Sequence, residues 1–317
     1  MHDWHCATRG VPRGPACSAR HMPQRSGFPR WLIVCATVLL ASCQRAGILD
    51  PQGPIGSAQL LLLINATEIM LVVVVPVILA TLGVAWWYRS SNPRAGRSEE
   101  LAYEGRIDFV VWSIPALVVI LLGGVNWISS HQLDPREPIA ANGKPLEVDV
   151  VSLDWKWLFI YPDQGVASVN KLIIPVGTPI SLELTSSGVM NSFFVPQLGS
   201  QIYTMAGMTT RLNLLADYPG TYRGFSAQFS GDGFSDMHFE AEAVPDDKFA
   251  QWLDSVHGAG PELDAKAYAD LAKPSAAVVP FTYRAVAPGL FEFITVSEMQ
   301  SDDALCRRNP SFMRAEK

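Results

Sequence analysis

The sequence contains few charged residues and few cysteines for its length. Only 17% of its 317 residues are Asp, Glu, Lys or Arg, and the net charge at pH 7 is −6. With a mean hydropathy of +0.16, this composition is too apolar for an ordinary soluble protein, so part of the chain is expected to lie in a bilayer. Lys and Arg form no cluster interleaved with aromatic residues, which argues against nucleic acid as a partner.

The first 42 residues have the pattern of a secretory signal peptide. Two arginines precede an apolar run over residues 31–40, and Leu-Ala-Ser then leads into Cys43. A positive start, a short apolar stretch and small residues before a cleavage site are typical of such peptides, and the residues ending at Cys43 resemble a bacterial lipobox. We therefore expect residues 1–42 to be a signal peptide, with Met22 as the expected start of translation, and a lipid on Cys43. The apolar run is too short for the alternative, a third membrane helix.

Cysteine and histidine are too few in the mature chain to form a metal site. Cys43 and Cys306 are the cysteines that remain after the signal peptide. Once Cys43 is acylated, no structural disulfide can form within one chain. The three remaining histidines have no ligand spacing, and each is interpreted as a surface or packing residue; they are His131, His238 and His257.

Two long apolar stretches follow the signal peptide. Residues 60–88 end in Trp-Trp-Tyr before an arginine, and residues 108–129 carry a tryptophan near each end. Both are long enough to cross a bilayer, and aromatic ends are typical of its interfaces. The segment 89–107 between them is rich in arginine, so the positive-inside rule places it in the cytoplasm. Residues 43–59 would then form a lipidated periplasmic N-terminus, and the C-terminal domain would also be periplasmic.

Each apolar stretch carries one carboxylic acid. Asp108 stands at the start of the second stretch, where a carboxylate can simply stabilise a helix N-terminus through the helix dipole. Glu68 lies well inside the first stretch. A charged group there costs about 2.5–3.5 kcal/mol on insertion scales, so Glu68 is expected to be neutral or to face a partner helix.

Beyond residue 145 the pattern changes to short β-prone runs separated by Gly, Pro, Asn and Asp. Apolar and polar residues alternate in Val148-Asp149-Val150 and over residues 181–185, as expected for strands with one buried face. These runs predict an antiparallel sandwich or barrel over residues 145–245. Residues 246–317 are expected to form a helical extension with two short helices and a tail. The expected strands are residues 146–153, 155–161, 171–175, 180–185, 209–215, 220–225 and 237–244.

One segment of this domain has the spacing of a binuclear copper loop, Cys-x-x-x-Cys-x-x-x-His-x-x-Met, with almost every ligand replaced. Serines take both cysteine positions, phenylalanine takes the histidine position, and asparagine takes an upstream histidine position. Thiolates and imidazoles suit copper, whereas hydroxyl groups and phenyl rings do not. By spacing alone, the segment could also be an ordinary Gly/Ser-rich loop. The degenerate copper positions are Asn191, Ser226, Gln228, Ser230, Phe234 and Met237, and only the methionine could still ligate.

This layout resembles subunit II of haem–copper terminal oxidases, and most closely their quinol-oxidase branch of the cytochrome bo type. The motifs that carry the resemblance are Asp-Trp-Lys-Trp-Leu-Phe-Ile-Tyr-Pro at 154–162, residues 189–203, Met-Ala-Gly-Met at 205–208 and residues 229–237. The resemblance covers essentially the whole mature chain. It implies a transmembrane α-helical hairpin followed by an all-β cupredoxin-like sandwich lacking copper, with a short helical C-terminal extension.

The resemblance implies a non-redox subunit of a respiratory quinol oxidase that reduces oxygen to water. Without copper in this chain, electrons must enter elsewhere, and the implied donor is a membrane quinol acting through subunit I. Haem and copper are expected in subunit I, and no cofactor is expected in this chain. The implied partners are subunit I, which this chain would brace and cap, the other subunits of the oxidase, and membrane lipid. The implied location is the bacterial inner membrane, with the chain as a two-pass lipoprotein.

The resemblance also assigns roles to individual residues. Relatives carry a glutamate at the position of Asp108, at the mouth of a proton-uptake channel, so the implied role of Asp108 is proton uptake. Aspartate is one methylene shorter, which puts its reach in question. Trp155 and Trp157 lie where tryptophans help to receive electrons in copper-bearing relatives. With no copper behind them, we expect these two rings to serve packing and subunit contact.

Two other functions compete with this interpretation. The first is a cytochrome c oxidase subunit II that holds copper through unusual ligands; it is disfavoured because four of the needed donors are absent together. The second is a structural or binding membrane lipoprotein unrelated to respiration. Genes for a large haem-binding subunit beside this one would distinguish the respiratory functions from it.

Overall fold

The computed structural model describes residues 47–96, 105–139 and 143–297. A short 3-10 turn, η1 (Gly47–Leu49), precedes two long helices, α2 (Pro54–Trp87) and α3 (Gly105–Gln132). Both are long and apolar enough to cross a membrane. Both begin before the expected apolar stretches; for α2 the reason is that Pro54 suits the first turn of a helix and the residues after it are compatible with helix. Cys43 lies outside the described residues.

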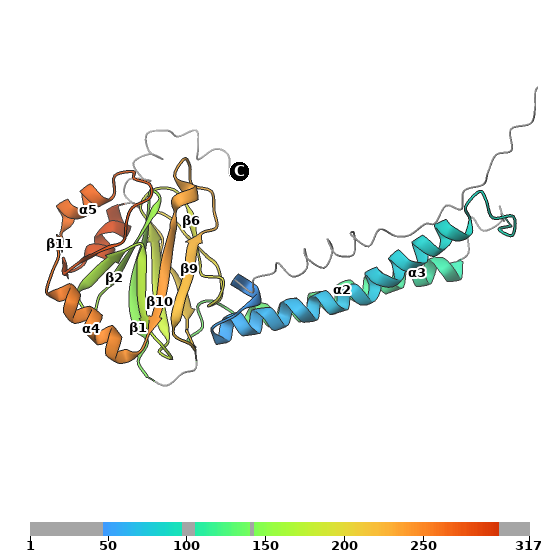
Figure 1. Ribbon diagram of the computed structural model, residues 1–317, viewed down its shortest axis with the longest axis horizontal. Coiled ribbons are helices and arrows are strands. Elements are labelled where there is room, and N and C mark those ends of the chain that lie inside the picture. The colour runs from blue at the N-terminus through green and yellow to red at the C-terminus, as the bar shows by residue number, and fades with distance from the viewer. Residues whose placement is uncertain (1–46, 97–104, 140–142, 298–317) are drawn as a thin grey trace, which may run out of the picture. The chain divides into compact units, whose positions relative to one another are not determined.

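The remainder of the described chain is a β-sandwich followed by a helical extension (Figure 1). One sheet has the strand order β12-β3-β2-β1-β5-β8 and the other β4-β10-β9-β6-β7. All seven expected strands are present within one residue of their predicted ends. The strands are β1 (Leu146–Leu153), β2 (Lys156–Tyr161), β3 (Val166–Val169), β4 (Lys171–Pro175), β5 (Ile180–Ser186), β6 (Asn191–Phe194), β7 (Ile202–Thr204), β8 (Thr210–Leu214), β9 (Gly220–Ser226), β10 (His238–Val244), β11 (Glu262–Leu263), β12 (Phe281–Tyr283) and β13 (Ala285–Val286).

The strands that the sequence did not predict are short. None of β3, β6, β7, β11, β12 and β13 exceeds four residues, so their side-chain alternation is too brief to detect. The two helices expected after the sandwich are present as α4 (Asp246–His257) and α5 (Ala265–Leu271). The fold class is therefore confirmed as two apolar helices, a β-sandwich and a short helical extension. The expectation of an antiparallel sandwich is wrong in part, because β1 pairs parallel with β5 and β4 pairs parallel with β10.

The C-terminal extension gives the domain a second core. In β2, Trp157, Phe159 and Tyr161 point between the two sheets, whereas Leu158 and Ile160 point to the opposite face. That opposite face is covered by the extension, so every residue of β2 is buried. The extension contributes Leu263, Tyr268, Tyr283, Leu290, Phe291 and Ile294 to this second core. At β2, therefore, the sheet has no solvent-facing side, because both of its faces are buried.

A buried lysine fastens the extension to β2. Lys156 is 1% exposed, and its Nζ donates hydrogen bonds to the Lys273 carbonyl at 2.8 Å and to the Ser275 Oγ at 2.6 Å. Burial lowers the pKa of this ammonium group, and the nearby Asp154 opposes that shift. The oxygen atoms that accept hydrogen bonds from the ammonium group belong mainly to the extension, so Lys156 connects β2 to the extension.

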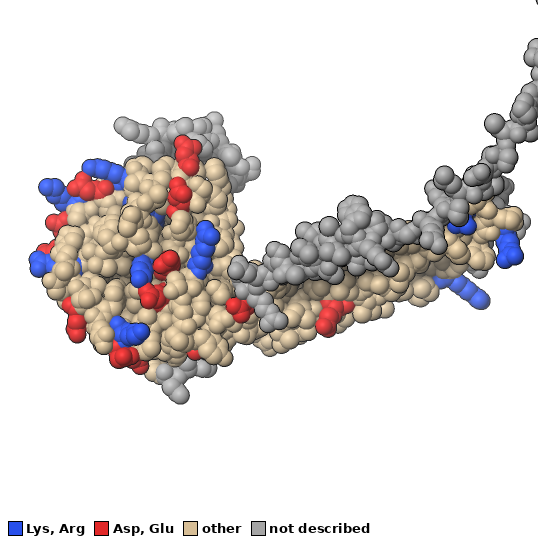
Figure 2. Space-filling model, in the orientation of Figure 1, with Lys and Arg blue, Asp and Glu red and all other residues tan. Residues whose placement is uncertain are grey.

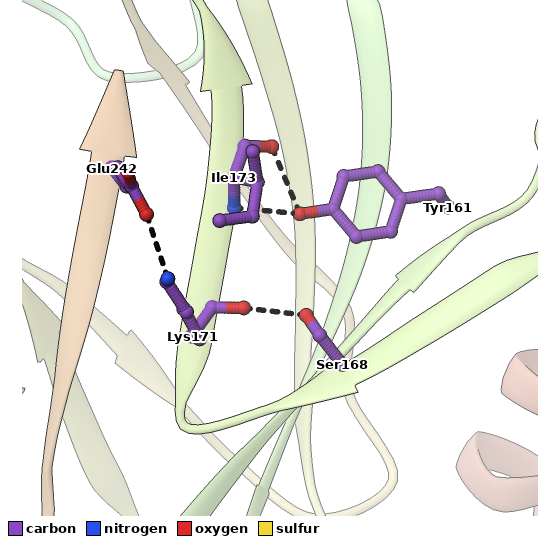
Figure 3. Close-up of polar contacts among 5 residues, drawn as sticks. All are labelled: Tyr161, Ser168, Lys171, Ile173 and Glu242. Atoms are coloured by element: carbon purple, nitrogen blue, oxygen red, sulfur yellow. Dashed lines mark hydrogen bonds and ion pairs between the residues drawn. The ribbon is translucent and has the colours of Figure 1, made fainter. Parts of the chain in front are cut away.

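The Tyr161 hydroxyl hydrogen bonds to the edge of β4 that has no strand neighbour (Figure 3). Its hydroxyl accepts a hydrogen bond from the Ile173 N–H and donates one to the Ile173 carbonyl, both at 2.9 Å. On the other side of β4, Lys171 pairs with Glu242 of β10 at 2.7 Å. Since β4 has a strand neighbour on one side only, the tyrosine satisfies backbone groups that would otherwise be buried and unpaired.

The beginning of α2 is hydrogen bonded to loops of the sandwich. The Gly56 N–H donates to the Leu198 carbonyl at 3.2 Å, and the Gln59 Nε2 donates to the Ser200 Oγ at 2.9 Å. A Cβ added to Gly53 would lie 2.1 Å from the Leu215 carbonyl oxygen, so only glycine allows this approach. The membrane helix and the sandwich are thus joined at close-packed backbone.

The raised pKa of Asp149 leads us to predict that the stability of the domain decreases as pH rises. Its burial, followed by the charges of three neighbouring carboxylates, raises its pKa from 3.8 to about 7. Those carboxylates are Glu183, which lies opposite Asp149 on β5, Glu292 of the extension and Glu147; Arg211 of β8 pairs with Glu183. The folded state holds the Asp149 proton more tightly than the unfolded state does. Protonated Asp149 therefore contributes to the free energy of unfolding, and this contribution is complete below pH 4 and is lost as pH rises through 7.

Substituting Asp149→Asn is expected to remove this contribution. Relative to the Asn variant, the wild-type protein should become progressively less stable between pH 4 and 8, and urea unfolding midpoints across that range measure the difference. Asp232→Asn, which removes an exposed carboxylate, serves as the control. A wild-type minus Asp149→Asn difference that stays constant with pH would contradict the prediction.

Candidate functional site

The degenerate copper positions meet at one end of the second sheet. Asn191 is the first residue of β6 and Ser226 the last of β9, and these two strands pair antiparallel. The chain then passes through the 3-10 turn η2 (Phe234–Asp236) to Met237, immediately before β10. Neighbouring strand ends therefore bring together residues that are up to 46 positions apart in the sequence, from 191 to 237.

A chain of hydrogen bonds fills the first half of this site. The Ser226 Oγ donates to the Asn191 Oδ1 at 3.2 Å, and the Asn191 Nδ2 lies 3.2 Å from the Val189 carbonyl and 3.5 Å from the Ser152 Oγ. Ser152 in turn bonds the Thr204 Oγ1 at 2.9 Å. Four of these side chains are nearly inaccessible to solvent, namely Ser152, Asn191, Thr204 and Ser226. Partners within the protein therefore compensate for their burial.

The second half of the site is a serine and a methionine. The Ser230 Oγ donates to the Met237 Sδ at 3.7 Å, and Met237 is 1% exposed within the main core. The Phe234 ring makes an edge contact with the Phe229 ring at 5.5 Å between centroids. Gln228 takes part through its backbone carbonyl, which lies 3.1 Å from the Ser226 Oγ. The remaining thioether is thus occupied by packing and by a hydroxyl donor.

Trp155 holds the loop in place. Its Nε1 donates to the Ser230 carbonyl at 3.1 Å, and a Cβ added to Gly233 would lie 2.3 Å from its ring. Trp157 is fully buried and contacts the rings of Phe193 and Phe239. Packing is therefore confirmed for both tryptophans. The contact of Trp155 with the loop was not predicted, although the glycine at 233 is the one sequence signal that allows it.

The residues at this site do not fit copper. Hydroxyl, amide and phenyl groups replace the thiolates and imidazoles, which leaves one thioether as a soft donor. Within residues 47–96, 105–139 and 143–297, no group of three or more His, Cys, Asp or Glu side chains is arranged to hold a metal ion. The geometry instead describes a hydrogen-bonded polar cluster at the copper positions.

Asp108, the other predicted site residue that the structure describes, lies in a membrane helix and not in the sandwich. Asp108 is in the first turn of α3 and is half-buried. It lies near the end of the helix that follows the arginine-rich segment. Ser152 and Thr204, which complete the polar cluster, were missed because neither belongs to a recognisable motif.

Similar proteins decide the family. A family model described as the periplasmic domain of cytochrome c oxidase subunit II matches residues 163–244, and one described as the COX aromatic-rich motif matches residues 258–299. Cytochrome bo(3) ubiquinol oxidase subunit 2 of Pseudomonas aeruginosa is 44% identical over 275 residues, which is 87% of this chain and 83% of that protein. The chain belongs to the subunit II family of haem–copper quinol oxidases.

Other members of this subunit II family also match most of the chain. Ubiquinol oxidase subunit 2 of Acetobacter aceti is 48% identical over 261 residues, covering 82% of this chain and 84% of that protein. Quinol oxidase subunit 2 of Bacillus cereus is 35% identical over 239 residues, covering 75% and 82%. The aromatic-rich motif coincides with the extension that builds the second core. This chain is therefore a subunit of a respiratory haem–copper oxidase, with a cupredoxin-like sandwich.

Proposed function

We propose that this chain is the non-redox subunit II of a proton-pumping quinol oxidase in the bacterial inner membrane. In this proposal subunit I binds haem and copper and takes electrons from quinol, and the complex reduces oxygen to water. The observation that carries the proposal is the polar cluster at the copper positions. A subunit that receives electrons from cytochrome c needs thiolate and imidazole ligands for copper at these positions. Here the side chains of Ser226 and Asn191 are instead hydrogen bonded to each other.

The same proposal assigns a mechanical role to the chain. The hydrogen bonds from Gly56 and Gln59 of α2 to the sandwich support such a role, because they make the periplasmic domain continuous with a membrane helix. The sandwich would cap subunit I, the two helices would brace it within the bilayer, and a lipid on Cys43 would add a second anchor. Lipid anchors hold a protein less firmly than membrane-spanning helices do, so the helices would provide most of the attachment.

Electron-donor preference tests the proposal directly. The purified oxidase complex is expected to consume oxygen with a quinol as donor and to show negligible turnover with reduced cytochrome c alone. Oxygen consumption in a respirometer, with haem content used to normalise enzyme concentration, measures both rates. Turnover driven by cytochrome c without quinol would instead support a copper-bearing subunit.

Asp108 is proposed to collect protons at the cytoplasmic side for uptake into the enzyme. A carboxylate at the membrane edge can take protons from water and pass them inward. Asp108→Asn is therefore expected to slow quinol-driven oxygen reduction by about a hundredfold, the lower end of the range for losing one proton-transfer group. Asp108→Glu keeps the carboxylate and should retain or raise the rate.

Helix stabilisation predicts a different outcome for the same variants. A carboxylate in the first turn stabilises a helix through the dipole by only about 0.3–1 kcal/mol, so a purely structural Asp108 would leave the turnover of assembled Asp108→Asn unchanged. Haem content of the purified complex separates assembly from turnover. Normal haem with reduced turnover supports proton uptake, and normal haem with normal turnover contradicts it.

A further inference from the structure

Helix α2 presents one face to α3. A groove between the two helices is lined on the α2 side by Gln59, Leu62, Leu63 and Ala66, and on the α3 side by Leu122, Val125 and Asn126. The α2 residues in this groove recur at intervals of three and four, so they lie on one side of the helix. This face is already occupied by the chain's own second helix.

A second stripe on α2 faces away from α3. Leu61, Asn65, Glu68 and Val72 are spaced by four, three and four residues, which also places them on one side of the helix. At 3.6 residues per turn, Glu68 lies about 200° around the axis from Ala66. All four residues of the stripe are exposed, and Leu61 and Val72 are 60% and 73% exposed. No part of the described chain covers this stripe.

The two polar residues of the stripe lack partners. Among the described residues, neither the Asn65 side chain nor the Glu68 side chain has a hydrogen-bond or ion-pair partner. The adjacent Thr67 is different, because its Oγ1 donates to the Leu63 carbonyl of its own helix at 2.7 Å. The hydroxyl of Thr67 is therefore satisfied without any neighbour, whereas the carboxyl of Glu68 and the amide of Asn65 are not.

The position of Glu68 makes lipid a poor neighbour. It lies eight residues beyond Leu60, or about 12 Å at 1.5 Å per residue, inside a hydrocarbon core of about 30 Å. Lysine and arginine can extend to the interface from such depths, but glutamate has a short stem. In Figure 2 an acidic side chain lies on the tan surface part-way along the helical hairpin, away from the blue basic side chains at the far end of the hairpin. Polar groups at such depth are found facing protein or water-filled cavities.

We infer that the stripe Leu61, Asn65, Glu68 and Val72 is a contact surface for a transmembrane helix of another subunit of the oxidase. That helix carries a hydrogen-bond donor or a basic side chain at the depth of Glu68. The carboxyl accepts from this donor and the Asn65 amide adds a second bond, while Leu61 and Val72 pack on either side. This inference rests on the proposed function for the identity of the neighbour, and it names the residues that specify the contact.

Photo-crosslinking in the intact oxidase tests the contact. A benzophenone amino acid at Val72, activated in native membranes, is expected to join this chain to another oxidase subunit, identified by mass spectrometry of the adduct. The same probe at Ala66 should react instead with the chain's own α3. Adducts of the Val72 probe with lipid alone, or with a protein outside the oxidase, would overturn the inference.

Substitutions test the role of the polar groups. Glu68→Leu is expected to lower the amount of this chain retained by the detergent-purified oxidase at least fivefold, whereas Glu68→Gln, which still hydrogen bonds, should retain most of it. Thr67→Val is the matched control, because its hydroxyl serves only its own helix. Leucine suits a membrane helix, so insertion is preserved, and protease resistance of the sandwich verifies the fold. Equal retention of Glu68→Leu and wild type would overturn the inference.

These outcomes are separable from those of the proposed function. Turnover driven by cytochrome c in the wild-type complex would overturn the quinol proposal while leaving the Val72 adduct unchanged. Quinol-driven turnover with no adduct at Val72 would overturn the contact alone.

Discussion

A variant carrying Asn191→His, Ser226→Cys, Ser230→Cys and Phe234→His is expected to bind stoichiometric copper and to become coloured, whereas the wild-type protein remains free of copper. The substitutions restore two thiolates and two imidazoles at the positions that the fold already brings together, with Met237 retained. Copper analysis after reconstitution and dialysis, together with visible and near-infrared absorption, measures the result.

Two controls give this experiment its meaning. The wild-type protein, taken through the same reconstitution, tests the claim that serine and asparagine cannot hold copper, and stoichiometric copper there would contradict it. A variant with Asn191→His and Phe234→His alone supplies imidazoles without thiolates and should retain copper poorly. If the fourfold variant folds but stays free of copper, the strand ends do not preserve the geometry of a copper site.

Gly224→Ala is expected to destabilise the sandwich by about 3 kcal/mol, the upper part of the usual range for overpacking a core. Gly224 lies in β9 directly opposite Phe239 of β10, and a Cβ at this position would lie 2.1 Å from the Phe239 ring. That ring is held by Trp157, Phe159 and Phe193, so it has little room to move. Urea unfolding of the purified protein, followed by tryptophan fluorescence, measures the loss.

Gly220→Ala is the matched control on the same strand. A Cβ there would approach Tyr222 no closer than 3.4 Å, an ordinary contact, so its cost should be a small fraction of that at Gly224. Replacing Phe239 with leucine in the Gly224→Ala background should recover part of the loss, because the smaller side chain leaves space for the methyl group. Equal effects at the two glycines would show that backbone propensity, rather than the clash, sets the cost.

Local alternation predicted most of the sandwich but not its second core. Val148 and Val150 flank the half-buried Asp149 as expected for a strand with one buried face. In β2 the same rule fails, because Leu158 and Ile160 are covered by residues more than 100 positions later in the chain. A run of apolar residues is compatible with burial on both faces, but only the folded extension identifies what covers the outer one.

The candidate site divides in a similar way. Local spacing predicted the copper positions within residues 226–237, and the family resemblance favoured this interpretation over an ordinary Gly/Ser-rich loop. The residues that hydrogen bond to those positions belong to other strands and turns. Ser152 bonds Asn191, Thr204 bonds Ser152, and Trp155 bonds the Ser230 carbonyl. No local pattern distinguishes a serine that completes a buried network from one that faces solvent.

What this sequence determined by itself is chemical: which donors are present, which are absent, and which stretches are apolar enough for a bilayer. Those properties belong to side chains and short segments, so they can be read without a fold. The tertiary structure decided which polar groups satisfy one another, how the extension buries the outer face of β2, and which face of α2 beside Glu68 is not covered by any described residue. These depend on contacts between residues distant in sequence, which arise only when the strands and helices have packed.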